Sequence, residues 1–168
     1  MARIPKYYWD ACVWIELISQ SIEDRFKRCA HVISEVQQDR AELWTSAFTL
    51  AEVYKRKCNG NYASLPEDQD DEFESFFKSR LVKPILVDVQ VAKVSRRLCR
   101  KYQCLRKPQD AIHVASCIIG NMDELHTFDA KDLIKLDGKI TVRNGNTLKI
   151  SHPPLPLQGE LFDGESSS

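Results

Sequence analysis

The sequence predicts an α/β fold, a three-layer α/β/α sandwich built on a mainly parallel sheet. Segments with strand character alternate with segments of helical periodicity, which is the pattern of βαβ units. One segment, Pro108–Gly120, is apolar around most of a helical circumference, so we expect it to be buried between layers. Acidic residues stand at the ends of several elements, and sites in such folds form beyond the carboxyl ends of the strands.

The strands are short runs bounded by acidic, glycine or asparagine residues. We expect them at Lys6–Trp9, Glu42–Ser46, residues 84–87 and residues 124–127, with a terminal hairpin that joins 140–142 to 148–150. Asp10 follows the first of these strands directly and Asp129 lies just beyond the fourth. The sequence Asn144-Gly145-Asn146 predicts the turn of the hairpin.

The helices are recognised by their start and stop signals. We expect them at residues 11–18, 22–36, 50–54, 67–80, 89–102, 108–120 and 133–136. Residues 21–24 resemble a capping box, Ser46 or Thr49 is expected to cap the third helix, and Asp88 the fifth. Pro108 at a first helical position and Gly120 at the end are typical of one complete helix. A loop is expected after residues 58–61.

Length and composition indicate one globular domain. The chain has 168 residues, 43% hydrophobic and 29% charged, which suffices for a single well-buried core. We expect the domain to span residues 1–151 and residues 152–168, rich in proline, glycine and serine, to form a disordered tail. The six cysteines have irregular spacing, which favours reduced thiols and a cytoplasmic location. No signal peptide core or membrane span is evident.

Each acidic residue of interest has an ordinary structural explanation. Asp10 could cap the helix that follows it, and Asp110 could complement the positive end of a helix macrodipole. Glu52 could pair with a basic residue one turn later on a solvated helix face. Asp129 and Asp132 could be turn and first-turn acids. No single residue is specific, but their order and local sequence are.

These acids lie in short motifs along the chain. The motifs are Trp9-Asp10-Ala11, Thr49-Leu50-Ala51-Glu52-Val53, Asp110-Ala111-Ile112-His113-Val114-Ala115, and Thr127-Phe128-Asp129 with Asp132 shortly after. Over roughly residues 6–142 the pattern resembles the PIN domain family, in particular single-domain proteins of the VapC toxin type. The resemblance implies an α/β/α fold and a metal-dependent ribonuclease that cuts phosphodiester bonds with water and leaves a 5′-phosphate.

Carried over by position, the resemblance assigns the site residues. Asp10, Glu52, Asp110 and Asp129 match the acidic quartet, and Ser46, Thr127 and Asp132 match neighbouring polar positions. Since carboxylate oxygens are hard ligands, such a cluster suits Mg²⁺ or Mn²⁺, and the cation relieves the repulsion between the acids. We expect Asp10 and Asp110 to be the principal ligands, with Asp129 on the same or a second ion. Glu52 is expected to bind through water or to orient the nucleophile.

A basic segment precedes the Asp110 motif. Residues 89–109 contain seven basic residues and no acidic one, although the net charge of the chain is zero. The candidates for phosphate contacts are Arg96, Arg97, Arg100, Lys101, Arg106 and Lys107. A solvated helix face explains the same charges equally well. His113 could hydrogen-bond near the site, but a packed helix histidine is the favoured interpretation.

The resemblance also implies partners: an RNA substrate, a cognate antitoxin over the acidic cleft, and a second copy in a homodimer. Residues 158–162, Gln-Gly-Glu-Leu-Phe, resemble the peptide that bacterial replication proteins insert into the sliding clamp, a match short enough to arise by chance. An alternative function is a catalytically inactive PIN-like module that binds RNA or protein. A phosphotransfer domain is disfavoured because Asp10-Ala11-Cys12 lacks a second aspartate two residues on.

Overall fold

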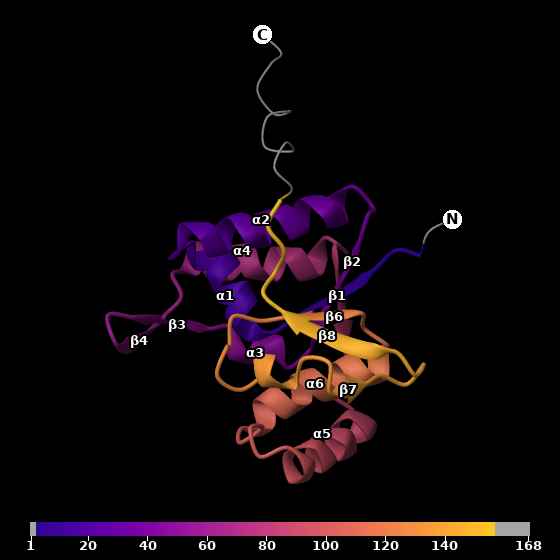
Figure 1. Cartoon of the computed structure of the whole chain (residues 1–168). Coiled ribbons are helices and arrows are strands. Elements are labelled where there is room, and N and C mark those ends of the chain that lie inside the picture. The colour runs from indigo at the N-terminus through magenta and orange to yellow at the C-terminus, as the bar shows by residue number, and fades with distance from the viewer. Residues whose placement is uncertain (1–2, 157–168) are drawn as a thin grey trace.

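The structure is a computed structural model that describes residues 3–156, and it has one six-stranded sheet between two helical layers (Figure 1). The strands of this sheet are β1 (Lys6–Trp9), β2 (Glu42–Ser46), β5 (Val82–Ile85), β6 (Glu124–His126), β7 (Ile140–Thr141) and β8 (Thr147–Ser151). Their order is β5-β2-β1-β6-β8-β7, and all neighbours are parallel except β7 and β8. The predicted fold class and the terminal hairpin are confirmed.

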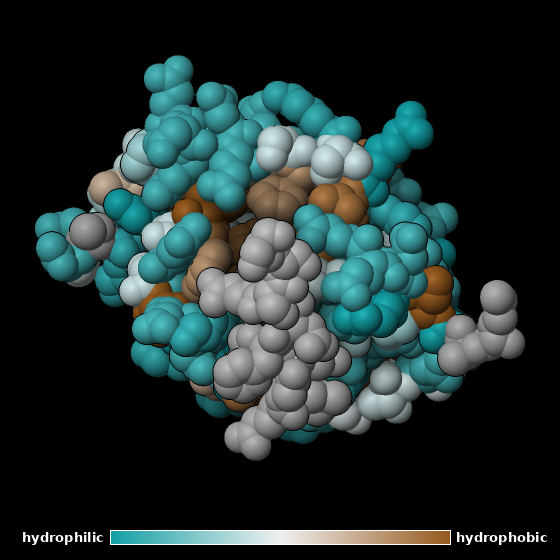
Figure 2. Space-filling model, turned by 90° about the horizontal axis from the view of Figure 1, so that it is seen from above, coloured by the Kyte–Doolittle hydropathy of each residue, from teal (hydrophilic) through white to brown (hydrophobic). Residues whose placement is uncertain are grey.

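The helices cover both faces of the sheet. On one face lie α1 (Ala11–Ser19), α2 (Glu23–Gln37) and α4 (Glu67–Lys78), and on the other α5 (Val89–Lys101) and α6 (Pro108–Gly120) (Figure 1). Two short elements, α3 (Thr49–Glu52) and the 3₁₀ helix η1 (Ile134–Leu136), follow β2 and β6. The outer face over α2 is mostly hydrophilic (Figure 2), as the exposed side of an amphipathic helix should be. None of the helices within residues 3–156 is long and apolar enough to cross a bilayer.

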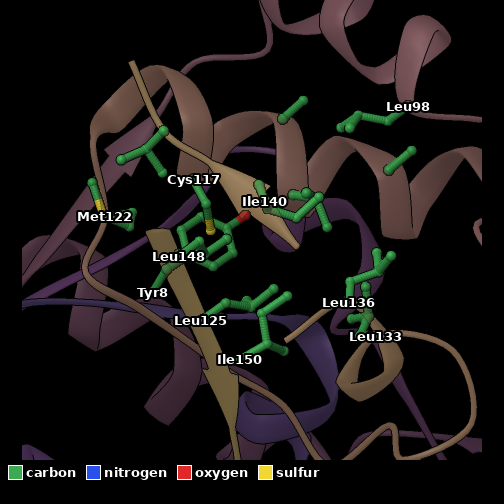
Figure 3. Close-up of a cluster of buried hydrophobic side chains, with 14 of the residues drawn as sticks. Tyr8, Leu98, Cys117, Met122, Leu125, Leu133, Leu136, Ile140, Leu148 and Ile150 are labelled. Carbon is green, nitrogen blue, oxygen red and sulfur yellow. The ribbon is translucent and has the colours of Figure 1, made fainter. Parts of the chain in front are cut away.

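Two hydrophobic cores hold the layers together. In β1, the alternation of a strand sends Tyr8 into one core and Trp9 into the other, and both are fully buried. Tyr8 packs with Leu125, Leu148 and Ile150 of the neighbouring strands beneath α6 (Figure 3). On the opposite face Trp14 of α1 contacts an aromatic cluster on α4, with ring centroids 5.6, 5.5 and 6.1 Å from those of Phe73, Phe76 and Phe77. These phenylalanines therefore face the interior of the protein.

Helix α6 has the predicted bounds, but Gly120 serves a different purpose from the one its position suggests. The left-handed residue that ends the helix is Asn121, with φ of 52°. Gly120 lies where the chain crosses its neighbours closely, because a Cβ there would meet the side chains of Met122 and Ile85 at 2.5 and 2.8 Å. A side chain at position 120 would therefore require the ends of the Met122 and Ile85 side chains to shift, whereas asparagine is favoured at position 121 by the left-handed backbone.

Several local predictions are wrong, among them the cap of α3, which begins after Phe48 without a side-chain cap from Ser46 or Thr49. The capping box does not form: Ile22 stands at the start of α2 without a side-chain cap, and the Ser21 hydroxyl donates instead to the Glu16 carboxylate at 3.0 Å. The third strand begins two residues earlier than predicted, since Val82 is buried and pairs with Leu43 while Leu86 is 73% exposed.

The helix expected through residue 54 ends at Glu52, and the expected loop contains a hairpin. Its strands are β3 (Lys55–Cys58) and β4 (Asn61–Ser64), which form a separate two-stranded sheet. Both turn residues, Asn59 and Gly60, have positive φ, 49° and 83°. This is the Asn-Gly signature of a tight β-turn, and that signal was present in the sequence.

The chain continues in contact with the domain beyond β8. His152 hydrogen-bonds the Thr127 carbonyl through Nδ1 at 2.8 Å and stacks on Phe128, and the Arg28 guanidinium donates to the Pro153 carbonyl. The domain boundary at residue 151 stays a prediction. The clamp-like residues 158–162 lie outside the described part of the chain.

Candidate functional site

The predicted acidic residues gather at the carboxyl edge of the parallel sheet. Asp10 follows β1, Asp129 and Asp132 follow β6, Asp110 is in the first turn of α6, and Glu52 ends α3 after β2. Parallel strands bring these chain positions to one edge although more than a hundred residues separate the first from the last.

Three of the acids are close enough to share a cation. Carboxylate oxygens of Asp110, Asp129 and Asp132 all lie within 4.8 Å of one another, and each residue is partly buried. Asp110 Oδ2 is buried and has no hydrogen-bond partner within residues 3–156. An unpaired buried carboxylate oxygen is costly unless something else balances it. The oxygen-only donor set and this unpartnered atom fit a hard divalent cation such as Mg²⁺ or Mn²⁺.

The charge on Asp110 is disfavoured in the absence of a cation. Burial raises the pKa of Asp110 to about 6, and the negative charges of Asp129 and Asp10 add to the shift. The positive charges of Lys107 and His113 oppose it. A divalent cation would favour the ionised form that these surroundings disfavour.

A tight turn after β6 orients the other two acids of the triad. Asp129 Oδ1 accepts hydrogen bonds from the amides of Lys131 and Asp132, at 2.9 and 3.1 Å. The Asp129 amide donates to the buried hydroxyl of Thr127 at 2.9 Å. Thr127, predicted as a supporting residue, thus fixes the turn, while Asp132 belongs to the acidic triad itself.

Asp10 lies beside this triad without being part of it. Asp10 is only 4% exposed. Its carboxylate caps α1 by accepting a hydrogen bond from the Val13 amide at 3.2 Å, and it accepts another from the Cys12 thiol at 2.9 Å. Burial raises the pKa of Asp10, and the positive charge of His113 partly offsets this effect. The structural role of a helix cap is therefore confirmed. The expectation that Asp10 is a principal metal ligand stays a prediction.

Burial also raises the pKa of the Cys12 thiol well above its usual value, and the charge of Asp10 adds to this shift. These surroundings favour the protonated thiol, which donates to Asp10. Its sulfur also accepts the amide of Phe128 at 3.1 Å, which connects α1 to the turn after β6. No pattern in the sequence indicated this role.

Glu52 is held by a buried histidine. His113 Nε2 lies 2.8 Å from Glu52 Oε2, and its Nδ1 lies 2.7 Å from the Tyr8 hydroxyl. An ionised carboxylate only accepts, so Nε2 carries the proton that faces Glu52. Burial lowers the pKa of His113, but the hydrogen bond to Glu52 and the charges of Glu52, Asp10 and Asp110 outweigh it and raise the pKa overall.

His113 is thus both packed in the helix and bonded within the site, whereas the sequence favoured the first role alone. Its position one turn after Asp110 was the available signal, because residues three apart are neighbours on the same side of a helix. The contact with Glu52 spans 61 residues and is produced by the fold.

Two residues at the end of β2 position α3. Ser46, a predicted supporting residue, is fully buried and its hydroxyl accepts the Phe48 amide at 3.1 Å. Thr45, which the sequence analysis missed, donates to the Trp9 carbonyl at 2.7 Å and lies 2.9 Å from the Thr49 hydroxyl. This buried contact joins the end of β1 to the start of the helix that carries Glu52.

The predicted RNA-contacting side chains are all exposed. Arg96, Arg97, Arg100 and Lys101 belong to α5, and Arg106 and Lys107 to the segment before α6. Lys107 is close enough to the site to lower the pKa of Asp110. A role in RNA binding stays a prediction for the set.

Replacement of Asp110 with Asn should stabilise the metal-free protein at high pH. The carboxyl group has a pKa of about 6 in the folded protein and about 4 when unfolded, so folded protein holds a proton between those values that the unfolded chain releases. Stability is therefore lost as pH rises through this window. After allowance for solvent screening, the penalty above pH 6 is about 1 kcal/mol.

With EDTA present, we expect Asp110→Asn to raise Tm by a few degrees at pH 8 and by much less at pH 4.5, measured by circular dichroism. Asp71→Asn, a change to an exposed acid of α4, is the control. An equal gain at both pH values would contradict the assignment.

Divalent cations should stabilise the folded protein through the triad. An ion present at about a hundred times its Kd contributes about 2.7 kcal/mol, so Mn²⁺ should raise Tm in thermal melts. The double variant Asp129→Asn/Asp132→Asn should lose this rise. Asn at position 129 keeps an acceptor oxygen for the two turn amides, so the turn should survive. A rise as large as in the parent protein would exclude this site.

Comparisons with known proteins agree with this architecture. A model of the PIN domain matches residues 7–139. A search of curated proteins found no significant match. Among solved structures, VapBC2 from Rickettsia felis, bound to a DNA fragment from their promoter, matches with 14% identity and a TM-score of 0.56 over 86% of this chain and 98% of that one.

A second structure is VapC20 from Mycobacterium tuberculosis, described as a sarcin-ricin loop cleaving toxin. It matches with 14% identity and a TM-score of 0.56 over 73% of this chain and 89% of that one. At this identity the likeness concerns the fold. The family model, in contrast, covers most of the chain and spans β1, the Asp110 motif and the turn of Asp129 and Asp132. The protein belongs to the PIN domain family.

Proposed function

We propose that the protein is a metal-dependent endoribonuclease that hydrolyses RNA phosphodiester bonds, as the toxin of a toxin–antitoxin pair. The observation that carries this proposal is the triad of Asp110, Asp129 and Asp132, with an unpartnered buried oxygen on Asp110. It lies at the edge of the sheet where parallel α/β folds place their sites. VapC20, which shares the fold, is described as cleaving the sarcin-ricin loop.

The residues have distinct roles in this proposal. Asp110, Asp129 and Asp132 hold Mg²⁺ or Mn²⁺, and Asp10 adds negative charge beside them while it caps α1. A cation bound there supplies Lewis-acid chemistry, activating water and offsetting charge on the phosphate. Glu52, oriented by His113, directs the attacking water toward the phosphorus.

The toxin assignment rests on the resemblance to VapC proteins. It implies a cognate antitoxin that covers the acidic cleft and a homodimer as the active form. A small open reading frame next to the gene, whose product binds this chain and suppresses cleavage, would support the pairing. The tail residues 158–162 remain a candidate clamp peptide only by sequence.

Cleavage of RNA tests the proposed activity directly. We expect the wild-type protein to cut single-stranded RNA with Mn²⁺ and to stop when EDTA is added. Loss of a ligand should lower kcat of Asp110→Asn by at least roughly 100-fold, while Asp71→Asn, a change on the opposite face of the sheet from α6, stays active. If the purified wild-type protein binds RNA and never cuts it, the chain is an inactive PIN-like binding module.

The contact between His113 and Glu52 predicts a second kinetic effect. His113→Ala removes the group that orients Glu52, so we expect kcat to fall about 10- to 100-fold with little change in KM. His113→Gln, which keeps an amide donor, should recover part of the loss. Because both residues act through one contact, Glu52→Ala should cost little more in the His113→Ala background. Additive losses would show that the two act independently.

A further inference from the structure

The hairpin of β3 and β4 projects from the domain as a separate ribbon (Figure 1). Lys57 pairs with Tyr62 and Lys55 with Ser64 across the two strands, and every residue of β4 is exposed. Two short strands of this kind are marginally stable alone and have no core to bury. The ribbon is therefore held at its base, where Val53 and Leu65 are buried and the Leu65 amide donates to the Tyr54 carbonyl at 2.9 Å.

The ribbon combines positive charge with exposed aromatic rings. Lys55, Arg56 and Lys57 follow one another on β3, and no acidic residue occurs between residues 53 and 66. Tyr54 and Tyr62 are 53% and 69% exposed. Lys55 Nζ lies 4.9 Å from the centroid of each ring, so the amine of this partly buried lysine and the two exposed rings form one group on the ribbon.

This group is close to the acidic site along the chain and in space. The ribbon begins three residues after Glu52, and the Tyr54 amide donates to the Glu52 carbonyl at 3.1 Å. Strand β3 also contacts α1, the helix that Asp10 caps. A polymer lying across the acidic edge of the sheet therefore meets this ribbon beside the cleavage position.

We propose that the ribbon binds single-stranded RNA next to the scissile phosphate, an inference that rests on the proposed nuclease function. Lys55 and Lys57, which share a face of the ribbon with Tyr62, contact phosphates, and Tyr54 and Tyr62 stack on bases. Positive charge combined with aromatic faces is the pairing that proteins use for single-stranded nucleic acid. The exposed residues of β4 other than Tyr62 are Asn61, Ala63 and Ser64, which offer little of the apolar surface found at the core of a protein interface.

Binding should be measured in the Asp110→Asn background with EDTA, so that the RNA is not cut. The probe is a fluorescein-labelled 12-nucleotide oligouridylate, followed by anisotropy at several salt concentrations. We expect Lys55→Ala/Lys57→Ala to raise Kd about tenfold. The slope of log Kd against log salt concentration should fall by the amount expected for the loss of nearly two phosphate contacts. Tyr62→Ala should also raise Kd roughly tenfold, and Tyr62→Phe should restore binding, because stacking needs the ring and not the hydroxyl.

The matched control is Lys27→Ala/Lys78→Ala, which removes two exposed positive charges from α2 and α4 and should leave Kd within about twofold. Because Lys57 and Tyr62 are exposed and Lys55 is only partly buried, unchanged thermal melts should show that each variant folds. Ribbon variants that bind the oligonucleotide as tightly as the parent would overturn the inference even if the wild-type protein cuts RNA. Loss of binding to the antitoxin alone would assign the ribbon to a protein interface and overturn it as well.

Failure of the proposed function has a different signature from failure of this inference. If the wild-type protein never cuts RNA with Mn²⁺, the proposed nuclease function is wrong, whatever the anisotropy measurements show. Suppose that the wild type cuts RNA, that Tyr62→Ala cuts it more slowly at low RNA concentration, and that Tyr62→Phe restores the rate. This result supports both the nuclease function and the role of the ribbon. If Tyr62→Ala and the wild type cut RNA at the same rate at low RNA concentration, the proposed nuclease function stands, but the proposal that the ribbon binds the substrate is wrong.

Discussion

Repulsion between carboxylates is the constraint on which the site depends. Asp110, Asp129 and Asp132 have oxygens within 4.8 Å of one another, and burial holds the pKa of Asp110 at about 6. Such an arrangement opposes folding unless positive charge compensates it. The protein supplies part of this charge through His113 and Lys107, together with the positive end of α6. A divalent cation would supply the rest, so metal binding and folding would be thermodynamically coupled.

The two cores make this strained arrangement possible. Tyr8 is fully buried in the core beneath α6, yet its hydroxyl reaches His113, so the packing of β1 against α6 also sets the orientation of Glu52. Thr45 joins the end of β1 to α3 in the same way. The residues behind the site are part of the interior, where small shifts are costly.

The ribbon of β3 and β4 differs from the rest of the domain in how it is held. The layers of α/β/α architecture are held by long-range packing, whereas an exposed hairpin depends only on its base and its turn. Its basic and aromatic side chains stand between a site residue, Glu52, and the strongly acidic helix α4. Along the chain, the ribbon therefore separates a residue of the site from a strongly acidic helix.

The sequence determined the elements that local rules specify. The bounds of β1, β2 and α6, and the cap that Asp88 provides through the Val91 amide, follow from nearby residues, and so does the presence of acids after the strands. The PIN resemblance came from the same short motifs and is confirmed by the family match. The Asn59-Gly60 turn was readable from local sequence too, although the prediction placed a loop there.

Only the tertiary structure decided which acids share a space. It grouped Asp132 with Asp110 and Asp129, set Asp10 beside them as a helix cap, and joined Glu52 to His113 across 61 residues. Pairing with β2 also sets the bounds of β5 at Val82–Ile85, two residues before the predicted ones, so that Leu86 is exposed to solvent. The physical reason is that distances between side chains depend on how strands and helices pack, and packing sums many weak contacts between residues far apart in the chain.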